Sequence, residues 1–335
     1  MELLGATTTE LREFCEELNC PAFRGKQIAG WLYKKGVSHI DEMANLPKSL
    51  ISKLNETATL SRSRIVAETT ASDGVRKFLL ELADGERIES VLLPYSDRLT
   101  ACVSTQVGCA AGCAFCASAG LGLIRNLSAG EIVDQILTLQ AQSGERITNV
   151  VYMGVGEPLL NYGNVVKSVR LLNEEVGISA RQITVSTIGV IPRILKLAEE
   201  KLQITLAVSL HAPDDELRGN LIPLAGKYPL RELLRACRAY SETTGRRVTI
   251  EYMLLAGVND SPHQAQRLVS LLKGMLCNVN LIPYNPVPNL AYKRPETKRV
   301  TAFREVLEQA GITVTQRFER GDNIAAACGQ LRRSR

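Results

Sequence analysis

From about residue 98 onward, short apolar runs alternate with stretches whose apolar residues recur at helical spacing. The apolar runs, each about as long as a β-strand, lie at 101–107, 149–153, 182–187, 204–210, 248–255 and 278–283. Helical stretches lie between them, for example at 128–142 and 229–242. Strand and helix repeated in this order predict a parallel sheet, because right-handed crossovers carry the chain back over one face. Six repeats are fewer than the eight of a closed barrel, so an α/β fold with a partial (βα)6 barrel is expected.

The first hundred residues follow other patterns. Four apolar residues recur at i, i+3, i+4 and i+7 and predict a helix with one apolar face: Leu11, Phe14, Cys15 and Leu18. Strand-like runs between 64 and 93 are separated by turn signals at 72–74 and 84–85. The predicted organisation is a small helical domain over 1–56, a β-meander linker over 57–97, a (βα)6 core over 98–311, and a C-terminal strand and tail over 312–335.

Composition narrows the class of protein. Of 335 residues, 45% are hydrophobic and 22% are charged, as in an ordinary globular protein. The N-terminus lacks the pattern of a signal peptide, and no apolar run reaches the roughly 18–20 residues of a membrane-spanning helix. A cytoplasmic protein without a membrane partner is therefore expected. Nine cysteines in that compartment indicate thiol or metal chemistry rather than a disulfide framework.

The net charge of +5 is too small to indicate a nucleic-acid partner, but basic residues gather locally. Six lie within 24–53, six within 227–247 and five from Arg317 to the end, each group against two acidic residues. Such patches suit a phosphate backbone. A solvated face is the alternative interpretation of each patch.

Four cysteines lie within fifteen residues, at 102–116. Cys109, Cys113 and Cys116 form a C-x3-C-x2-C triplet on a glycine-containing loop that follows the first apolar run of the core. A 4Fe–4S cluster usually takes four cysteines, so a cluster held by three would leave one iron open for another ligand. Zinc is the alternative, but it needs a fourth ligand, and no nearby Cys or His clearly supplies one.

Polar residues follow several of the predicted strands, at the end of a parallel sheet where active sites lie. Glycines in Met153-Gly-Val-Gly-Glu-Pro158 let the backbone approach a ligand, and Glu157 offers a carboxylate to an ammonium group. The other residues of this rim are Ser186, Ser209, Leu210, His211 and Asn285. A structural role is the alternative for each of them.

The remaining cysteines divide into two groups. Cys15, Cys20, Cys237 and Cys277 read as small buried hydrophobic residues. Cys328 lies in a Gly- and Ala-rich segment with little to pack against, which indicates a loop able to deliver a thiol into a site. Cys102 lies at the expected rim, outside the triplet.

The chain resembles the RlmN/Cfr family of the radical S-adenosylmethionine (SAM) superfamily over nearly its whole length. The motifs that carry the resemblance are Cys102-Val-Ser-Thr-Gln-Val-Gly-Cys, the triplet, Arg125-Asn-Leu, Gly154-Val-Gly-Glu-Pro-Leu-Leu-Asn, Ser186-Thr-Ile-Gly, Ser209-Leu-His-Ala-Pro, Leu281-Ile-Pro-Tyr-Asn-Pro and Ala327-Cys-Gly-Gln-Leu. The resemblance implies one 4Fe–4S cluster on the three cysteines, whose open iron binds SAM and whose electron cleaves it to a 5′-deoxyadenosyl radical. It also implies SAM contacts from Gly156, Glu157 and the rim residues from Ser186 to Asn285.

The resemblance further implies a methyl carrier. Cys328 would take a methyl group from one SAM, and a second SAM would generate a radical on that group, which adds to adenine and leaves RNA bound to Cys328. Glu89 would accept the ring proton, although alternation alone predicts an exposed strand residue there. Cys102 would then attack Cys328 and release the product through a transient disulfide.

The implied product is 2-methyladenosine in the peptidyl transferase centre of 23S rRNA and at adenosine 37 of tRNA. The base would be flipped into the site while the N-terminal domain holds the RNA. A flavodoxin or ferredoxin would donate the electron, and a monomer is expected. Three alternatives remain open: methylation of adenine C8 as by Cfr, a radical SAM activase acting on a protein, and a non-catalytic cluster or zinc protein that binds RNA.

Overall fold

The computed structural model describes residues 1–118, 120, 122–317, 320–321 and 324–331. Its N-terminal part is a group of short helices. They are α1 (Thr8–Glu17), α2 (Phe23–Ala29), η1 (Gly30–Lys35), η2 (Ile40–Glu42) and α3 (Lys48–Thr57). Thr7 and Glu10 form a capping box that starts α1, and the apolar face predicted for this helix is confirmed, with Leu11, Phe14 and Cys15 buried.

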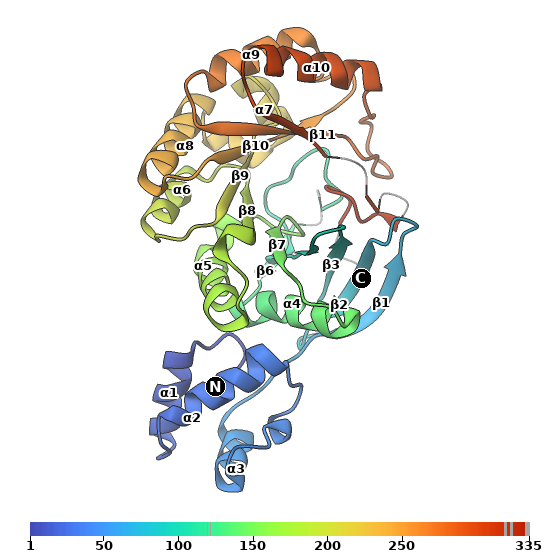
Figure 1. Ribbon diagram of the computed structural model, residues 1–335. Coiled ribbons are helices and arrows are strands. Elements are labelled where there is room, and N and C mark those ends of the chain that lie inside the picture. Colours follow the sequence, from blue (N-terminus) through green and yellow to red (C-terminus); the bar gives the residue numbers. More distant parts are fainter. Residues whose placement is uncertain (119, 121, 318–319, 322–323, 332–335) are drawn as a thin grey trace.

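The rest of the chain is organised around one sheet of ten strands, in the order β1-β2-β3-β4-β7-β8-β9-β10-β11-β12 (Figure 1). Its strands are β1 (Arg64–Thr70), β2 (Arg76–Glu81), β3 (Arg87–Pro94), β4 (Leu99–Cys102), β7 (Asn149–Tyr152), β8 (Ile183–Thr187), β9 (Thr205–Ser209), β10 (Val248–Leu254), β11 (Cys277–Pro283) and β12 (Val314–Gln316). From β4 to β12 all neighbours are parallel, which confirms the partial barrel of βα units.

The helices that follow these strands cover the outer side of the curved sheet, while the loop after β4 and the C-terminal segment lie on its inner side (Figure 1). The helices are α4 (Ala129–Ser143), α5 (Tyr162–Leu171), α6 (Ile191–Glu199), α7 (Asp215–Leu221), α8 (Leu230–Thr244), α9 (Pro262–Leu272) and α10 (Thr297–Gln309). Shorter helical turns are η3 (Pro158–Asn161), η4 (Leu172–Val176), η5 (Ala180–Gln182) and η6 (Pro223–Lys227). The inner side of the sheet is thus left for the site.

The strand predicted over 101–107 is wrong in its extent. The chain leaves the sheet after β4, because the backbone N–H of Ser104 donates to the side-chain Oε1 of Gln135 at 2.8 Å instead of continuing the ladder. The following residues form a separate two-stranded sheet, β5 (Gln106–Gly108) with β6 (Leu123–Asn126). This hairpin brackets the loop of the three cysteines.

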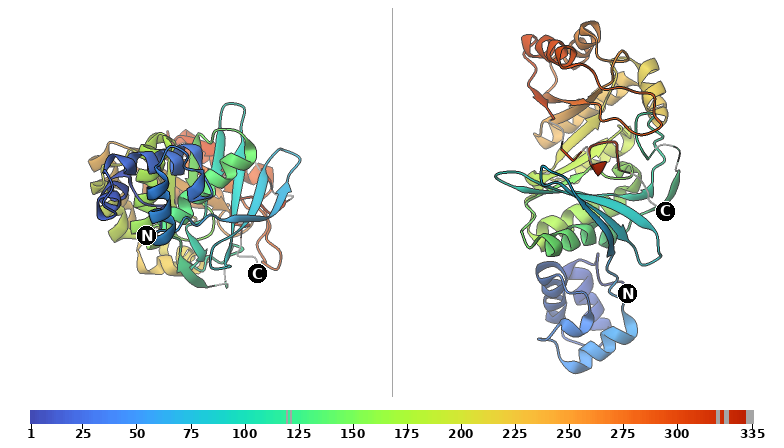
Figure 2. Two further views of the ribbon diagram at one scale, coloured as in Figure 1. Left: turned by 90° about the horizontal axis from the view of Figure 1, so that it is seen from below. Right: turned by 90° about the vertical axis from the view of Figure 1, so that its right-hand side faces the viewer.

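The meander β1–β3 continues the sheet of the barrel, since β3 pairs antiparallel with β4. The N-terminal helices form a separate lobe beyond α4 and α5 (Figure 2). The contacts between this lobe and the core include the ion pair of Lys167 with Glu10 at 2.8 Å and the hydrogen bond from the N–H of Thr8 to Glu175 at 3.2 Å. The domain limits given above remain predictions.

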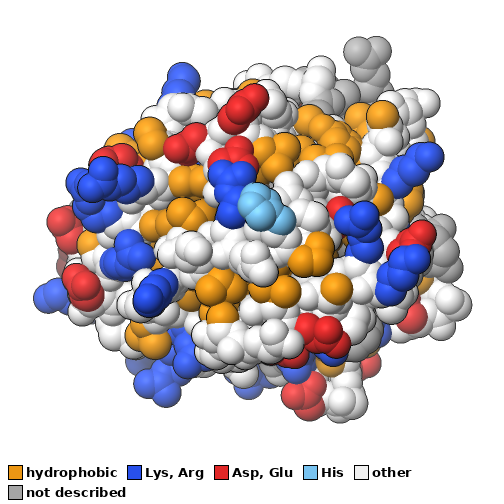
Figure 3. All heavy atoms as spheres, turned by 90° about the horizontal axis from the view of Figure 1, so that it is seen from above, with side chains coloured by type: hydrophobic (Ala, Val, Ile, Leu, Met, Phe, Trp, Pro, Cys, Tyr) orange, Lys and Arg blue, Asp and Glu red, His pale blue; other side chains and the backbone are white. Residues whose placement is uncertain are grey.

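At the end of the molecule where α9 and α10 lie, basic and acidic side chains are interspersed rather than gathered by sign (Figure 3). Ion pairs among the described residues there include Arg267–Asp214, Arg299–Asp260, Arg304–Glu308 and Lys298–Glu296. Such pairs leave little net charge to attract a phosphate backbone. Of the predicted basic tail, residues 318–319, 322–323 and 332–335 lie outside the described residues. None of the described helices is long and apolar enough to cross a membrane.

Candidate active site

The loop of the three cysteines depends on a close backbone approach at Gly108. This glycine has φ +76°, and a Cβ there would lie 2.0 Å from the carbonyl oxygen of Gly122. The next N–H, that of Cys109, donates to the same oxygen at 3.0 Å. Only glycine fits such a position, so the hairpin β5–β6 fixes where the loop begins.

Burial raises the pKa of all three thiols, and a neighbouring thiol of the triplet adds to the effect at Cys109 and Cys113. Burial raises the pKa of Cys109 to about 11, and burial with the proximity of Cys116 and Cys109 raises that of Cys113 well above its ordinary value. Unligated, these groups are therefore neutral thiols, and a cationic metal centre would be needed to hold them as thiolates. Among the described residues, no three His, Cys, Asp or Glu side chains are placed so that they could hold one metal ion. A cluster spreads its ligands over different irons, so the donor set fits a 4Fe–4S cluster.

A cavity lies between this loop and the carboxyl ends of β7 to β10. Its lining includes Cys113, Cys116, Gly156, Glu157, Ser186, Ser209 and His211. The structure thus brings together most of the residues predicted to contact SAM. Two predicted contacts lie elsewhere: Leu210 is fully buried in the hydrophobic core, and Asn285 lines a neighbouring cavity. A side-chain contact between Leu210 and a ligand of this cavity is therefore not supported.

Glu157 is held rigidly at the inner end of this cavity. Its two carboxylate oxygens accept N–H groups from Leu159 at 2.9 Å and Ile188 at 2.8 Å. Burial raises the pKa of Glu157 to about 7, against the lowering effect of these hydrogen bonds. A buried carboxylate of this kind gains from a bound cation, which suits the ammonium group of SAM.

His211 reaches the same cavity from a left-handed backbone conformation, with φ +60°. Its Nδ1 accepts the N–H of Met253 at 3.0 Å, so the neutral ring carries its proton on Nε2. The ring also packs edge-on against Phe115 of the cysteine loop. Burial lowers the pKa of His211 to about 3, and the nearby Arg218 guanidinium acts in the same direction. His211 can therefore offer one neutral N–H donor to a ligand.

The buried neutral His211 predicts a loss of stability in acid. The unfolded chain binds a proton at this side chain below its ordinary pKa of 6.5, whereas the folded chain does so only near 3. The contribution of His211 to the free energy of unfolding therefore falls as the pH drops through 6.5, by about 2 kcal/mol between pH 7 and pH 5. Urea unfolding at both pH values should show that the wild type loses about 2 kcal/mol relative to His211→Asn between pH 7 and pH 5. The comparison isolates His211, because other buried groups such as Glu157, whose raised pKa acts in the opposite direction, contribute equally to both proteins. In the variant, Oδ1 of the asparagine can still accept the Met253 N–H. An equal loss in both proteins would contradict the prediction.

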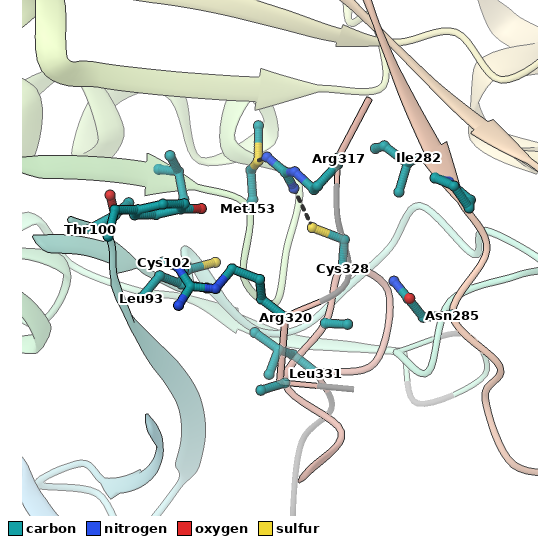
Figure 4. Close-up of a pocket in the computed structure, with 15 residues that line it drawn as sticks. Leu93, Thr100, Cys102, Met153, Ile282, Asn285, Arg317, Arg320, Cys328 and Leu331 are labelled. Atoms are coloured by element: carbon teal, nitrogen blue, oxygen red, sulfur yellow. Dashed lines mark hydrogen bonds between the residues drawn. The ribbon is translucent and has the colours of Figure 1, made fainter. Parts of the chain in front are cut away.

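A second cavity adjoins the first and contains both cysteines predicted to act on substrate. Cys102 ends β4, and its sulfur points toward Cys328 (Figure 4). Burial, followed by the proximity of Cys328, raises the pKa of Cys102 to about 12. All nine cysteines are free thiols. The two cavities share four lining residues: Met153, Ile282, Arg317 and Cys328. Cys328 therefore lies on the wall between the SAM cavity and the cavity of Cys102.

Arg317 is a site residue that the sequence reading missed, because it was counted with the basic tail. Its Nη1 donates to Sγ of Cys328 at 2.5 Å, and its Nη2 lies 3.5 Å from Sδ of Met153 (Figure 4). The proximity of Cys328, and then of Glu251, raises the pKa of Arg317 although burial opposes it. The signal was available, since Arg317 directly follows β12 and so obeys the same strand-end rule as the other rim residues.

Glu89 is buried, with 5% of its surface exposed, so the exposed position expected from strand alternation is wrong. It lies in a third cavity with Lys77, Cys116, Ala325 and Gln330. That face of the meander is covered by the segment that carries Cys328. Glu89 is therefore close to the cysteine loop. Cys102 pairs with Val91, two residues along β3 from Glu89, so Glu89 and Cys102 lie on the same face of the sheet, although they line different cavities.

Comparison with known proteins agrees with this site. Residues 103–269 match the Radical SAM superfamily, and residues 1–60 match the family described as "Ribosomal RNA large subunit methyltransferase N-terminal domain". With the cysteine loop on a partial barrel, these matches define a radical SAM protein.

The relatives narrow the family. Relatives named "Probable dual-specificity RNA methyltransferase RlmN" include one from Gloeobacter violaceus and one from Clostridium novyi. The one from Gloeobacter violaceus is 51% identical over 99% of this chain and 95% of its own length, and the one from Clostridium novyi is 48% identical over 99% and 98%. The crystal structure of a radical SAM methyltransferase from Sphaerobacter thermophilus superimposes with a TM-score of 0.94 at 47% identity, covering 99% of both chains. The chain belongs to the RlmN family.

Proposed function

We propose that this chain is a radical SAM RNA methyltransferase that forms 2-methyladenosine in 23S rRNA and in tRNA, with Cys328 as the methyl carrier. The observation that carries the proposal is the place of Cys328 on the wall shared by the two cavities. A carrier must meet the methyl donor on one side and its resolving thiol on the other, and this position allows both.

Carbon C2 of adenine is electron-poor and cannot attack the methyl group of SAM as an amine would, so a protein nucleophile is needed. Sγ of Cys328 would displace the methyl group from the sulfonium of SAM, releasing S-adenosylhomocysteine and the thiol proton. Cys109, Cys113 and Cys116 would hold the cluster, which when bound supplies the electron for cleavage of a second SAM. Glu157 and the Nε2–H of His211 would orient that SAM.

Two further residues would complete the cycle. Glu89 would accept the proton from C2 once the carrier carbon is bonded to the ring. Sγ of Cys102, after loss of its thiol proton, would then attack Sγ of Cys328. The electron pair of the S–C bond would pass to the carrier carbon, which takes up a proton and becomes the methyl group of the released base. The disulfide left between the two cysteines would be reduced by a cellular thiol. The 4Fe–4S ligand set, the SAM contacts and these roles follow from the family resemblance and are supported by the shared cavities.

RNA is favoured over a protein substrate by the match of residues 1–60 to a domain of ribosomal RNA methyltransferases. The relatives named RlmN favour C2 over the C8 position methylated by Cfr. Neither the activase nor the non-catalytic alternative accounts for these matches.

The position of the methyl group tests the proposal. We expect 2-methyladenosine in 23S rRNA and tRNA from a deletion strain complemented with this chain, and none from the uncomplemented strain. Digested nucleosides compared by mass spectrometry with 2-methyl and 8-methyl standards give the answer. Appearance of 8-methyladenosine would instead assign the Cfr activity, and no methyladenosine in either RNA would refute the function.

A further inference from the structure

The segment that carries Cys328, residues 324–331, which we call the carrier loop, is fastened to several parts of the molecule. The N–H of Ala117, next to cluster residue Cys116, donates to the carbonyl of Gly329 at 2.7 Å. Ser118 donates to the carbonyl of Leu331 at 2.8 Å, and Gln330 donates to that of Pro286 at 3.0 Å. These contacts hold the end of the carrier loop, so the position of the Cys328 thiol depends further on where the start of the loop lies.

The start of the carrier loop is strained. Ala325 has φ +52°, in the left-handed region that a residue with a Cβ rarely adopts. Such a conformation is unfavourable for a residue with a Cβ and persists only when neighbouring contacts hold it. Its carbonyl oxygen accepts a hydrogen bond from Nζ of Lys77 at 3.2 Å. This bond is one of the contacts that can hold the strained residue in place.

Lys77 also faces Glu89. In the antiparallel register of β2 and β3, Leu79 lies opposite Glu89 and Lys77 lies opposite Val91, so Lys77 and Glu89 share one face of the meander as diagonal neighbours. Nζ of Lys77 lies 3.4 Å from Oε1 of Glu89, and the two side chains are only 17% and 6% exposed. One ammonium group therefore contacts both the carboxylate of Glu89 and the backbone of the carrier loop.

From this geometry we propose that Lys77 is a positioning residue that couples the charge of Glu89 to the placement of the carrier loop. The inference rests on the role proposed above for Glu89 as proton acceptor. While Glu89 is an anion, its attraction keeps Nζ at the position from which it also binds Ala325. Screening by solvent is weak at this burial, so loss of the negative charge loosens the hold on Lys77 and hence on the loop.

The coupling would act at the step where it is needed. When the proton on C2 passes to a carboxylate oxygen of Glu89, the electron pair of the C–H bond stays with the ring and Glu89 becomes neutral. At that moment Cys328 must exchange its bond to carbon for a bond to Cys102. A loosened carrier loop lets Sγ of Cys328 turn toward Cys102. Transfer of the proton from Glu89 to solvent then restores the contacts of Lys77 with Glu89 and Ala325, which together we call the latch.

Hydrogen–deuterium exchange of the full chain, without RNA or cofactor, tests the latch. The test uses two variants: Lys77→Met, and Glu89→Gln, which keeps the shape of the side chain and removes its charge. In both we expect the amides of residues 324–331 to exchange about tenfold faster, because each variant weakens one hydrogen bond from a charged donor. The N–H groups of Ala326 and Gln330, bonded to the carbonyls of Gly321 and Ala327, should report it. Lys77→Arg should retain slow exchange.

The matched control is Lys167→Met, which removes the ion pair with Glu10 far from the loop and should leave residues 324–331 unchanged. Faster exchange in Lys77→Met without any change in Glu89→Gln would overturn the coupling to charge. Unchanged exchange in both would overturn the latch. Because no RNA is present, the measurement can fail while the methylation assay succeeds, and the reverse, so the two proposals are tested separately.

Discussion

Anaerobic reconstitution of the Cys113→Ala variant is expected to yield protein with almost no iron, where the wild type holds about four irons per chain. Cys113 is one of three thiols on a loop whose entry is fixed by the approach of Gly108 to Gly122. With only three protein ligands, loss of one leaves two, which hold a cluster poorly. Iron and sulfide analysis, together with the visible absorption of the reconstituted protein, measures the effect.

Cys237→Ala provides the matched control for this experiment. Cys237 is also buried, but it lies on α8 in the hydrophobic core and lines neither of the cavities that contain Cys328. Its removal should leave the iron content of the reconstituted protein unchanged. One bound zinc and no iron in the wild type would end the radical SAM account of the cysteine loop.

The repeated strands of the core could be predicted from sequence because parallel strands are buried on both faces and read as continuous apolar runs. The run at 149–153 became β7, and the run at 182–187 became β8, each within one residue of the expected limits. The run at 101–107 misled, because burial of Val103 and Val107 does not require them to lie in one strand. The hydrogen bond from the N–H of Ser104 to the side chain of Gln135 on α4 ends the strand, and no local sequence pattern predicts this bond.

The site was predictable where it follows strand ends and less so where distant segments meet. Ser186 and Ser209 were found because each lies at the carboxyl end of a parallel strand. Burial of Glu89 was missed because its cover comes from residues beyond 285, nearly two hundred positions away. The contact of Arg317 with Cys328 was missed because a charged residue in a basic tail is usually solvated. The burial of a polar strand face by segments distant in the sequence is a tertiary property. The alternation of polar and apolar residues along one strand cannot predict it.

Cys102→Ala is expected to accumulate a covalent protein–RNA adduct, while Cys328→Ala forms none. Cys102 and Cys328 line one cavity, and the proximity of Cys328 contributes, after burial, to the raised pKa of Cys102. Without the sulfur of Cys102, nothing breaks the bond between Cys328 and the ring-bound carbon, so the adduct persists. Without Cys328, that bond never forms. A denaturing gel of protein incubated with RNA, SAM and reductant, with and without ribonuclease, distinguishes the two results.

The double variant and one distant cysteine sharpen this test. Cys102→Ala combined with Cys328→Ala should behave as Cys328→Ala alone, because the carrier acts before the resolving thiol. Cys277→Ala should turn over as the wild type does, since Cys277 lies at the start of β11, at the end of the strand away from the site, and lines neither cavity. Normal turnover by Cys102→Ala would refute the resolving role and would require release of the base by another nucleophile. Accumulation of adduct therefore depends on the order carrier first, resolving thiol second, which the place of Cys328 between the two cavities permits.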